Sequence, residues 1–261
     1  MDTRMDGKIV LVTGATQGIG RAVALRVANE GAAGVVIVGR DMARGADVAR
    51  EIEAEGTNCR FVASELAAPD AARNVMKAAL GHFGRIDALV NAAGATDRGS
   101  VAEAPEPLWD MLFAVNARAP FYLMQAVINH LRERGSPGAI VNILSINVHG
   151  GTPELAVYAA SKAALGVLTK NAAYAHRFDR IRINGINVGW TDTPAERHMQ
   201  AVTLGLGEGW LEAANAAQPS GKLLSADDIA RLTLFLLSDA SAPITGSLID
   251  QEQTLIMGLR D

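Results

Sequence analysis

The chain has 261 residues, of which 49% are hydrophobic, so it is long and apolar enough for one large domain with a substantial core. Its formal net charge is −4 and it contains no basic block, which argues against a nucleic-acid partner. Residues 1–8 are polar, no apolar run approaches membrane-spanning length, and the single Cys59 lies in an apolar run. We therefore expect a cytoplasmic protein with no membrane partner.

Strand-like and helix-like segments alternate along the whole chain. β-branched apolar runs predict strands, and apolar residues at helical spacing predict helices. The expected elements are, in chain order, strand 8–13, helix 21–30, strand 34–38, helix 42–55, strand 59–63, helix 69–83, strand 86–90, a long helix or broken pair over 108–134, strand 139–144, helix 157–175, strand 180–186, a helix through 237 capped by Ser225 and Asp228, and strand 247–250.

This alternation predicts the fold class. Helices between successive strands produce a mostly parallel sheet covered on both faces. We expect an α/β, Rossmann-type, doubly wound parallel sheet of about seven strands. No repeat, low-complexity tract or Pro-rich linker divides the sequence, so residues 1–261 are predicted to form a single domain.

A glycine-rich turn lies between the first expected strand and helix. Gly14, Gly18 and Gly20 directly follow the apolar run 8–13. Glycines permit a tight turn and let the backbone approach a pyrophosphate, which the N-terminus of a helix attracts. A lone glycine pattern is often an ordinary turn, but strand, turn and helix in this order favour a dinucleotide site.

The end of the second expected strand bears on the choice of cofactor. Gly39 and Arg40 stand where an acidic residue would bind the ribose hydroxyls of NAD. An arginine instead suits the 2′-phosphate of NADP, so we expect NADP(H) over NAD(H). Asp41 leaves the alternative open, because its carboxylate could pair with Arg40 or face the ribose.

Tyr158, Lys162 and Ser145 form a candidate proton-handling site. Tyr158 and Lys162 are four residues apart, so a helix over 157–175 places them on one face about one turn apart. A nearby ammonium favours the phenolate and lowers the pKa of a tyrosine, and a serine at a strand end can hydrogen-bond the reacting oxygen. Taken singly, each residue is more often structural.

Several motifs converge on one edge of the predicted sheet. The glycine turn, Arg40, the stretch Asn91-Ala-Ala-Gly94 and Ser145 each follow a strand. In open α/β sheets, ligands bind outside the carboxyl ends of the strands, near the point where the strand order reverses. We therefore expect the cofactor and the proton-handling residues to meet there.

From Gly7 to Asp250 the chain resembles the short-chain dehydrogenase/reductase family. The likeness rests on several motifs in the right order, namely Thr13-Gly-Ala-Thr-Gln-Gly-Ile-Gly20, Asn91-Ala-Ala-Gly94, Asn116 in Val-Asn-Ala, Ser145, and Tyr158-Ala-Ala-Ser-Lys162. The resemblance implies a catalytic tetrad of Asn116, Ser145, Tyr158 and Lys162. In it Tyr158 is the acid/base, Ser145 polarises the substrate oxygen, Lys162 holds the nicotinamide ribose, and Asn116 anchors a water.

The resemblance also implies the cofactor contacts. They fall on Gly14, Thr16, Gln17, Gly18, Ile19, Gly20, Arg40, Glu65, Leu66, Asn91, Ala92, Gly94, Tyr158, Lys162, Gly189, Thr191 and Thr193. Three positions depart from the family pattern. Glu65 replaces the usual Asp, Val188 replaces Pro before Gly189, and Asp250-Gln-Glu replaces Asp-Gly-Gly. The last change is expected to affect subunit packing and not the chemistry.

Polar residues around the motifs are candidates for the substrate pocket. They are Ser145, Asn147, His149, Glu154 and Trp190, with residues 191–221, called here the lid segment, as a mobile cover. Such side chains suit a hydroxylated substrate, although polar residues are common in any loop. The five histidines show no ligand spacing, so we expect no metal.

The leading hypothesis is an oxidoreductase that transfers a hydride between NADP(H) and a small polar alcohol or ketone, such as a sugar or polyol. A 3-oxoacyl-carrier-protein reductase is the alternative within the same chemistry. A non-catalytic NADP(H)-sensing protein is the alternative from another class. A hydrolase is disfavoured because no Gly-x-Ser-x-Gly elbow occurs. A homotetramer is implied by the resemblance alone.

Overall fold

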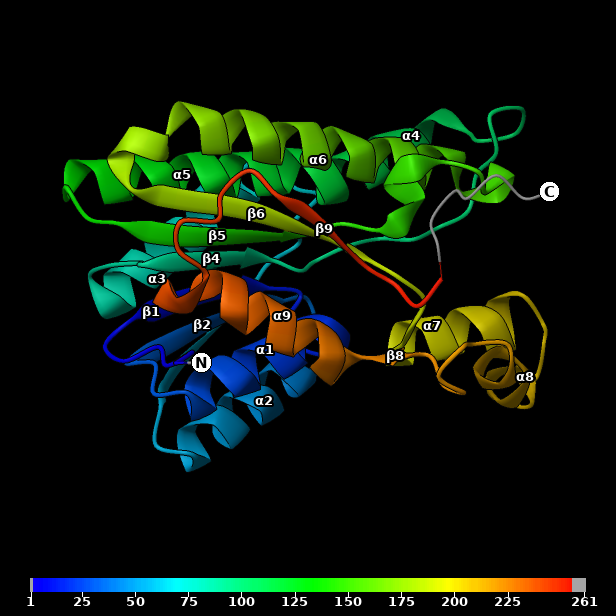
Figure 1. Cartoon of the computed structure of the whole chain (residues 1–261), viewed down its shortest axis with the longest axis horizontal. Coiled ribbons are helices and arrows are strands. Elements are labelled where there is room, and N and C mark those ends of the chain that lie inside the picture. The colour runs from blue at the N-terminus through cyan, green and yellow to red at the C-terminus, as the bar shows by residue number, and fades with distance from the viewer. Residues whose placement is uncertain (1, 255–261) are drawn as a thin grey trace.

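Seven parallel strands form one twisted sheet in the computed structural model, which describes residues 2–254 (Figure 1). The strand order is β3-β2-β1-β4-β5-β6-β9, so the order reverses between β1 and β4. The strands are β1 (Ile9–Thr13), β2 (Gly34–Gly39), β3 (Asn58–Ala63), β4 (Ala88–Asn91), β5 (Gly138–Ile143), β6 (Ile181–Val188) and β9 (Leu248–Gln251). The predicted doubly wound sheet of about seven strands is confirmed.

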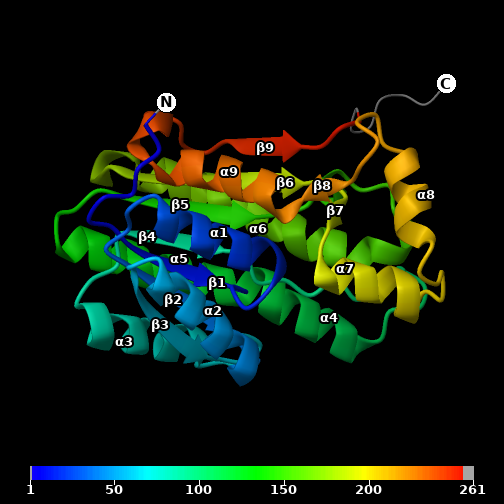
Figure 2. The same cartoon turned by 90° about the horizontal axis from the view of Figure 1, so that it is seen from below.

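Helices cover both faces of the sheet (Figures 1 and 2). One layer holds α1 (Gly18–Asn29), α2 (Met42–Ala54) and α9 (Ala226–Leu237), and the other holds α3 (Ala71–Phe83), α5 (Ala119–Glu133) and α6 (Ala156–Ala175). Side chains of a strand alternate between the two cores: Val10 packs with the first layer and Leu11 with the second. Both are fully buried, as expected for a parallel sheet between helices.

A single long helix spans residues 106–133, where the sequence predicted either one long helix or a broken pair of helices. α4 (Glu106–Phe113) continues through a π-helical turn, η1 (Ala114–Arg118), into α5. Pro120 has no N–H to offer the carbonyl four residues earlier, that of Asn116, which is a local reason for the widened turn. The 28-residue helix is long and apolar enough to cross a membrane, but 56% of its most apolar window is buried inside the protein.

Most element boundaries lie within a few residues of the expected ones. α1 begins at Gly18, three residues early, because the glycine turn itself forms the first helical turn. The predicted cap of α9 is confirmed: the Ser225 hydroxyl accepts from the Asp228 backbone N–H, and the Asp228 carboxylate accepts from the Ser225 N–H. These contacts satisfy donors that the helix itself leaves without partners.

The lid segment contains elements that the sequence did not predict. Strand β7 (Thr191–Asp192) pairs with β8 (Leu224–Ser225), and between them lie α7 (Pro194–His198), the π-helical η5 (Met199–Thr203) and α8 (Trp210–Ala216). They project beyond the carboxyl ends of the central strands (Figure 2). Trp210 stacks on Trp190 with ring centroids 6.1 Å apart. That this segment moves stays a prediction.

Candidate functional site

The glycine turn packs too tightly for side chains. Gly14 has φ +66°, and a Cβ there would lie 2.7 Å from the Cα of Ala93. A Cβ on Gly20 would lie 2.4 Å from the carbonyl oxygen of Gly14. The two glycines thus allow the turn to close on itself and on the stretch after β4.

The N-terminus of α1 is open to an anion. Gln17, which precedes the helix, has extended backbone, and no side chain accepts a hydrogen bond from the first turn in the described part of the chain. The N–H groups of this turn and the helix dipole therefore point at the crevice without a neutralising partner. This arrangement fits a pyrophosphate, the group that the sequence predicted here.

The end of β2 carries two guanidinium groups. The Arg40 side chain is 78% exposed and its guanidinium lies 3.5 Å from the carboxylate of Glu65. Asp41 accepts a hydrogen bond from the Arg44 N–H at 3.0 Å and so caps α2, and its carboxylate pairs with the Arg44 guanidinium at 2.9 Å. The carboxylate that might have faced a ribose is therefore engaged within α2.

Arg44 is a candidate that the sequence analysis missed. Its guanidinium also donates to the side chain of Gln17 in the glycine turn, which places a second positive charge beside the crevice. The signal was available, because Arg44 lies three residues after Asp41 in the first turn of a helix that opens at this edge.

Thr13 ties the stretch after β4 to the glycine turn. Its hydroxyl accepts from the N–H groups of Ala92 and Ala93, both at 3.1 Å. The side chain of Asn91 points inward: it is buried and donates to Asn142 at 2.8 Å. Any contact of Asn91 with a cofactor must therefore come from its backbone.

The four predicted tetrad residues come from three elements and meet in one place. Tyr158 and Lys162 lie one turn apart in α6, Asn116 comes from η1, and Ser145 follows β5. Both Lys162 and Asn116 approach Gly94: a Cβ added to this glycine would lie 3.3 Å from the Nζ of Lys162 and 3.5 Å from the Oδ1 of Asn116. All four side chains are buried.

Hydrogen bonds fix the orientation of this group. The Lys162 ammonium donates to the carbonyl of Ile143 in β5 at 2.8 Å. The Asn116 amide accepts from the N–H of Ala95 and donates to its carbonyl, both at 2.9 Å, and it also donates to the Ser161 hydroxyl at 3.0 Å. These contacts hold the Asn116 side chain between the stretch after β4 and α6.

Burial dominates the electrostatics of the site. It lowers the pKa of Lys162 to about 8 and raises the pKa of Tyr158. The hydroxyl of Ser145 acts against the rise at Tyr158, whereas the carboxylate of Glu196 adds to it. Lys162 is not among the groups that shift the pKa of Tyr158 here, so the lowering of the tyrosine pKa by this ammonium stays a prediction.

Asn147 holds Ser145 in place. The hydroxyl of Ser145 accepts from the backbone N–H and the amide of Asn147, both at 3.2 Å. Thr152 in turn donates to the Asn147 carbonyl oxygen at 3.0 Å. The amide predicted to line a substrate pocket is therefore already bonded to its neighbours.

The other predicted substrate residues are dispersed. His149 pairs with Asp250 in β9 at 3.0 Å, and Asp250 also accepts from Asn187 at 2.6 Å, so the imidazole is tied to the edge of the sheet. Glu154 is exposed. The Trp190 indole donates to the Glu196 carboxylate at 2.8 Å, which joins it to the lid segment.

The C-terminal segment reaches the predicted cofactor residues after β6. The carboxylate of Glu252 accepts from the Trp190 N–H at 3.2 Å, and a Cβ on Gly189 would lie 2.3 Å from the same carboxylate. The unusual C-terminus therefore contacts the segment after β6 within the chain, and its effect on subunit packing stays a prediction. Thr191 donates to the Gly189 carbonyl at 2.9 Å, and Thr193 caps α7 beside Gly18.

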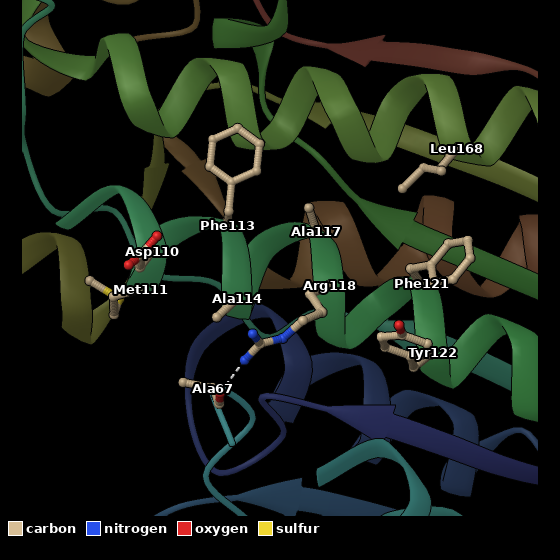
Figure 3. A pocket seen from close by; sticks show the side chains of 10 residues that line it. All are labelled: Ala67, Asp110, Met111, Phe113, Ala114, Ala117, Arg118, Phe121, Tyr122 and Leu168. Carbon is tan, nitrogen blue, oxygen red and sulfur yellow. Dashed lines mark hydrogen bonds between the residues drawn. The ribbon is translucent and has the colours of Figure 1, made fainter. Parts of the chain in front are cut away.

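A hollow elsewhere on the surface does not contain the tetrad. It lies on the outer face of α4, η1, α5 and α6 (Figure 3). Its lining is mainly apolar and comprises Ala67, Asp110, Met111, Phe113, Ala114, Ala117, Arg118, Phe121, Tyr122 and Leu168. Within residues 2–254, no cluster of three or more His, Cys, Asp or Glu side chains is arranged to hold a metal.

Comparison with known proteins identifies the family. The family profile described as short chain dehydrogenase matches residues 8–202. The chain belongs to this family. It is therefore an NAD(P)-dependent oxidoreductase, as the matching relatives and structures are.

Three relatives illustrate the range of substrates in the family. The chain is 32% identical to a 3-oxoacyl-[acyl-carrier-protein] reductase of Thermotoga maritima, over 97% of this chain and 100% of the relative. It superposes with a TM-score of 0.91 on L-sorbose reductase of Gluconobacter frateurii complexed with NADPH and L-sorbose, at 29% identity over 99% and 100% of the two chains. A 3-oxoacyl (acyl-carrier-protein) reductase of Agrobacterium tumefaciens with NADP bound gives a TM-score of 0.87, at 27% identity over 95% and 94%.

Replacing Gly20 by Ala should weaken binding of the nicotinamide cofactor by about tenfold or more, equivalent to ~1.4 kcal/mol. The added Cβ would meet the Gly14 carbonyl at 2.4 Å and force the turn open. The affinity is measured by fluorescence titration of the reduced cofactor. Gly81→Ala in α3 is the matched control, because a Cβ there meets no atom within 4 Å. Equal affinities of the two variants would contradict the prediction.

The stability of the wild type relative to Lys162→Met should rise with pH from about 8 upward. The pKa of Lys162 is about 8 in the folded protein and its ordinary value is 10.5, so the unfolded chain binds more protons between these values. Below about pH 8 the ammonium is charged in both states and the difference is constant. Denaturant unfolding of both proteins at several pH values measures the difference between their free energies of unfolding. A difference that does not change with pH would contradict the burial of a charged Lys162.

Proposed function

We propose that this chain reduces a small polar ketone, or oxidises the corresponding alcohol, with NADP(H) as cofactor. Tyr158 is the acid/base, Ser145 polarises the substrate oxygen, Lys162 holds the nicotinamide ribose, and Asn116 organises the proton path. The single observation that carries this proposal is the convergence of four buried polar side chains beside the glycine turn, at the carboxyl edge of the sheet.

The residues around the glycine turn would hold the cofactor. The open N-terminus of α1 suits the pyrophosphate, and the segment from Gly189 to Thr193, whose Thr193 contacts Gly18, would hold the nicotinamide. When bound, the nicotinamide supplies a hydride to the carbonyl carbon or accepts one from the alcohol carbon.

The chain's own residues manage the proton. In the direction of reduction, the Tyr158 hydroxyl gives its proton to the oxygen of the carbonyl group while the Ser145 hydroxyl donates a hydrogen bond to the same oxygen. Burial raises the pKa of Tyr158, so the phenol is protonated at neutral pH and ready to act as the acid. The ammonium of Lys162, with its pKa lowered to about 8, is held by the Ile143 carbonyl one helical turn from Tyr158.

A preference for NADP(H) is supported by charge at the end of β2. Arg40 is largely exposed, and Arg44 is near enough to the glycine turn to bind Gln17. Two guanidinium groups suit a phosphate better than a ribose diol, and Asp41 is engaged as a helix cap. The structures with NADPH and NADP bound agree with this choice.

A sugar or polyol is favoured as the substrate. The neighbour with a TM-score of 0.91 is a reductase complexed with L-sorbose. A 3-oxoacyl-carrier-protein reductase is the second candidate, because the Thermotoga maritima enzyme of this name is 32% identical over nearly the whole chain. A protein that only senses NADP(H) would have no need of the buried tetrad.

We also propose a cytoplasmic homotetramer. Phe121 and Tyr122 on α5 are 37% and 46% exposed and line the hollow of Figure 3. Exposed aromatic side chains beside an apolar hollow are typical of a protein–protein interface. A second copy of the chain is the expected occupant of this face.

The variant Tyr158→Phe should lose at least about a hundredfold in kcat, as is usual on removal of a general acid. The measurement is the absorbance of the reduced cofactor in a screen of ketones and alcohols with both NADP(H) and NAD(H). Tyr174→Phe, at a residue that is 71% exposed, is the control and should behave as the wild type. Unchanged turnover in Tyr158→Phe would refute the proposed role.

Neutral replacement of Arg40 or Arg44 should lower the ratio of kcat/KM for NADP(H) to that for NAD(H) about tenfold or more for each side chain, since a hydrogen bond to a charged group contributes ~1.5 kcal/mol or more. Arg50→Ala, an exposed arginine of α2 paired with Asp47, is the control for net charge. If Arg40→Ala and Arg44→Ala both retain the wild-type ratio, the assignment of the phosphate site is wrong.

A further inference from the structure

Glu196 in α7 is a carboxylate without a cationic partner. The guanidinium of Arg197, the next residue, is bound to Asp192 at 2.6 Å. No Lys, Arg or His nitrogen of residues 2–254 forms a salt bridge with Glu196. The side chain is only partly exposed, so its negative charge is less screened than that of a fully solvated residue.

The carboxylate is nevertheless held in a defined orientation. Its Oε1 accepts from the Trp190 indole at 2.8 Å and from the amide of Gln200, which is buried, at 2.7 Å. The Glu196 N–H donates to the Thr193 hydroxyl at 3.2 Å. Both of these hydrogen bonds use Oε1. Within residues 2–254, Oε2 accepts no hydrogen bond and is available to a ligand.

The anchors of Glu196 belong to the walls of the active site. Trp190 directly follows Gly189, and Thr193 lies 3.6 Å from the position of a Cβ on Gly18 in the glycine turn. The charge of Glu196 also acts on Tyr158, whose pKa it helps to raise. The hydrogen bonds to Thr193 and Trp190 therefore hold the carboxylate on the lid segment, next to the residues that contact the glycine turn.

We propose that Glu196 is a specificity-determining residue: its Oε2 accepts a hydrogen bond from a hydroxyl group of the substrate, and its charge excludes substrates that carry a carboxylate or phosphate near the reacting carbonyl. This inference rests on the proposed function and narrows the substrate class to neutral hydroxylated carbonyl compounds. A fixed carboxylate is a strong acceptor for a hydroxyl group. It repels a like charge strongly in a site that excludes water.

The test compares two ketones of similar size, neutral 4-hydroxy-2-butanone and anionic acetoacetate, on the enzyme loaded with NADP⁺ for binding, where no reduction can occur, and with NADPH for turnover. Binding is followed by the fluorescence of the stacked pair Trp190 and Trp210, and kcat/KM by the absorbance of NADPH. We expect the wild type to favour the neutral compound at least about tenfold, and Glu196→Gln to bring this ratio close to one. Glu208→Gln, an exposed carboxylate of the lid segment, should leave the ratio unchanged.

Two further readouts separate a specificity role from a structural one. The pH profile of kcat/KM in Glu196→Gln should show a lower pKa for Tyr158, because a negative charge that raises it has been removed. Glu196→Asp keeps the charge and should keep the exclusion of acetoacetate, with weaker binding of the hydroxyketone.

Three outcomes overturn the inference: a wild type that does not favour the neutral ketone, an unchanged ratio in Glu196→Gln, or an equal loss for both ketones in that variant. These outcomes are independent of the catalytic assignment. The ratio of binding affinities does not require turnover, whereas the activity of Tyr158→Phe tests the proposed function by itself.

Discussion

The hydrogen bond from the Lys162 ammonium to the carbonyl of Ile143 is the contact on which the site depends. It ties the first turns of α6 to the carboxyl end of β5 and holds a positive charge where water is excluded. Burial of this charge is costly, as the lowered pKa of Lys162 shows. The cost is compensated by the packing of α6 on the sheet, so the geometry of Tyr158 follows from the fold as a whole.

The crevice divides into regions of opposite charge. The N-terminus of α1 and the guanidinium groups of Arg40 and Arg44 lie at the glycine turn and the end of β2, whereas the lid segment carries the carboxylate of Glu196, which has no cationic partner among the described residues. In the proposed function, binding of the cofactor and selection of the substrate thus depend on separate residues. Among the similar structures, one fold is found with NADPH and L-sorbose and, in a 3-oxoacyl (acyl-carrier-protein) reductase, with NADP.

The motifs with local geometry were correctly placed from the sequence. The seven strands, the turn from Gly14 to Gly20 and the cap at Ser225 depend on residues close together in the chain, and all are found where expected. Boundaries shifted where tertiary contacts extend an element, as in α1. The lid segment was predicted, but its short helices and its strand pair were missed because they depend on distant partners, notably the pairing of β7 with β8.

The sequence by itself determined the fold class and the family and was enough to propose the tetrad, because strand periodicity, glycine spacing and the interval from Tyr158 to Lys162 are properties of neighbouring residues. Only the tertiary structure decided where each polar side chain is used. It engages Asp41 in a helix cap, His149 with Asp250, Asn147 with Ser145 and Glu196 with Trp190. These partners are chosen by packing between segments far apart in the chain, which no local pattern encodes.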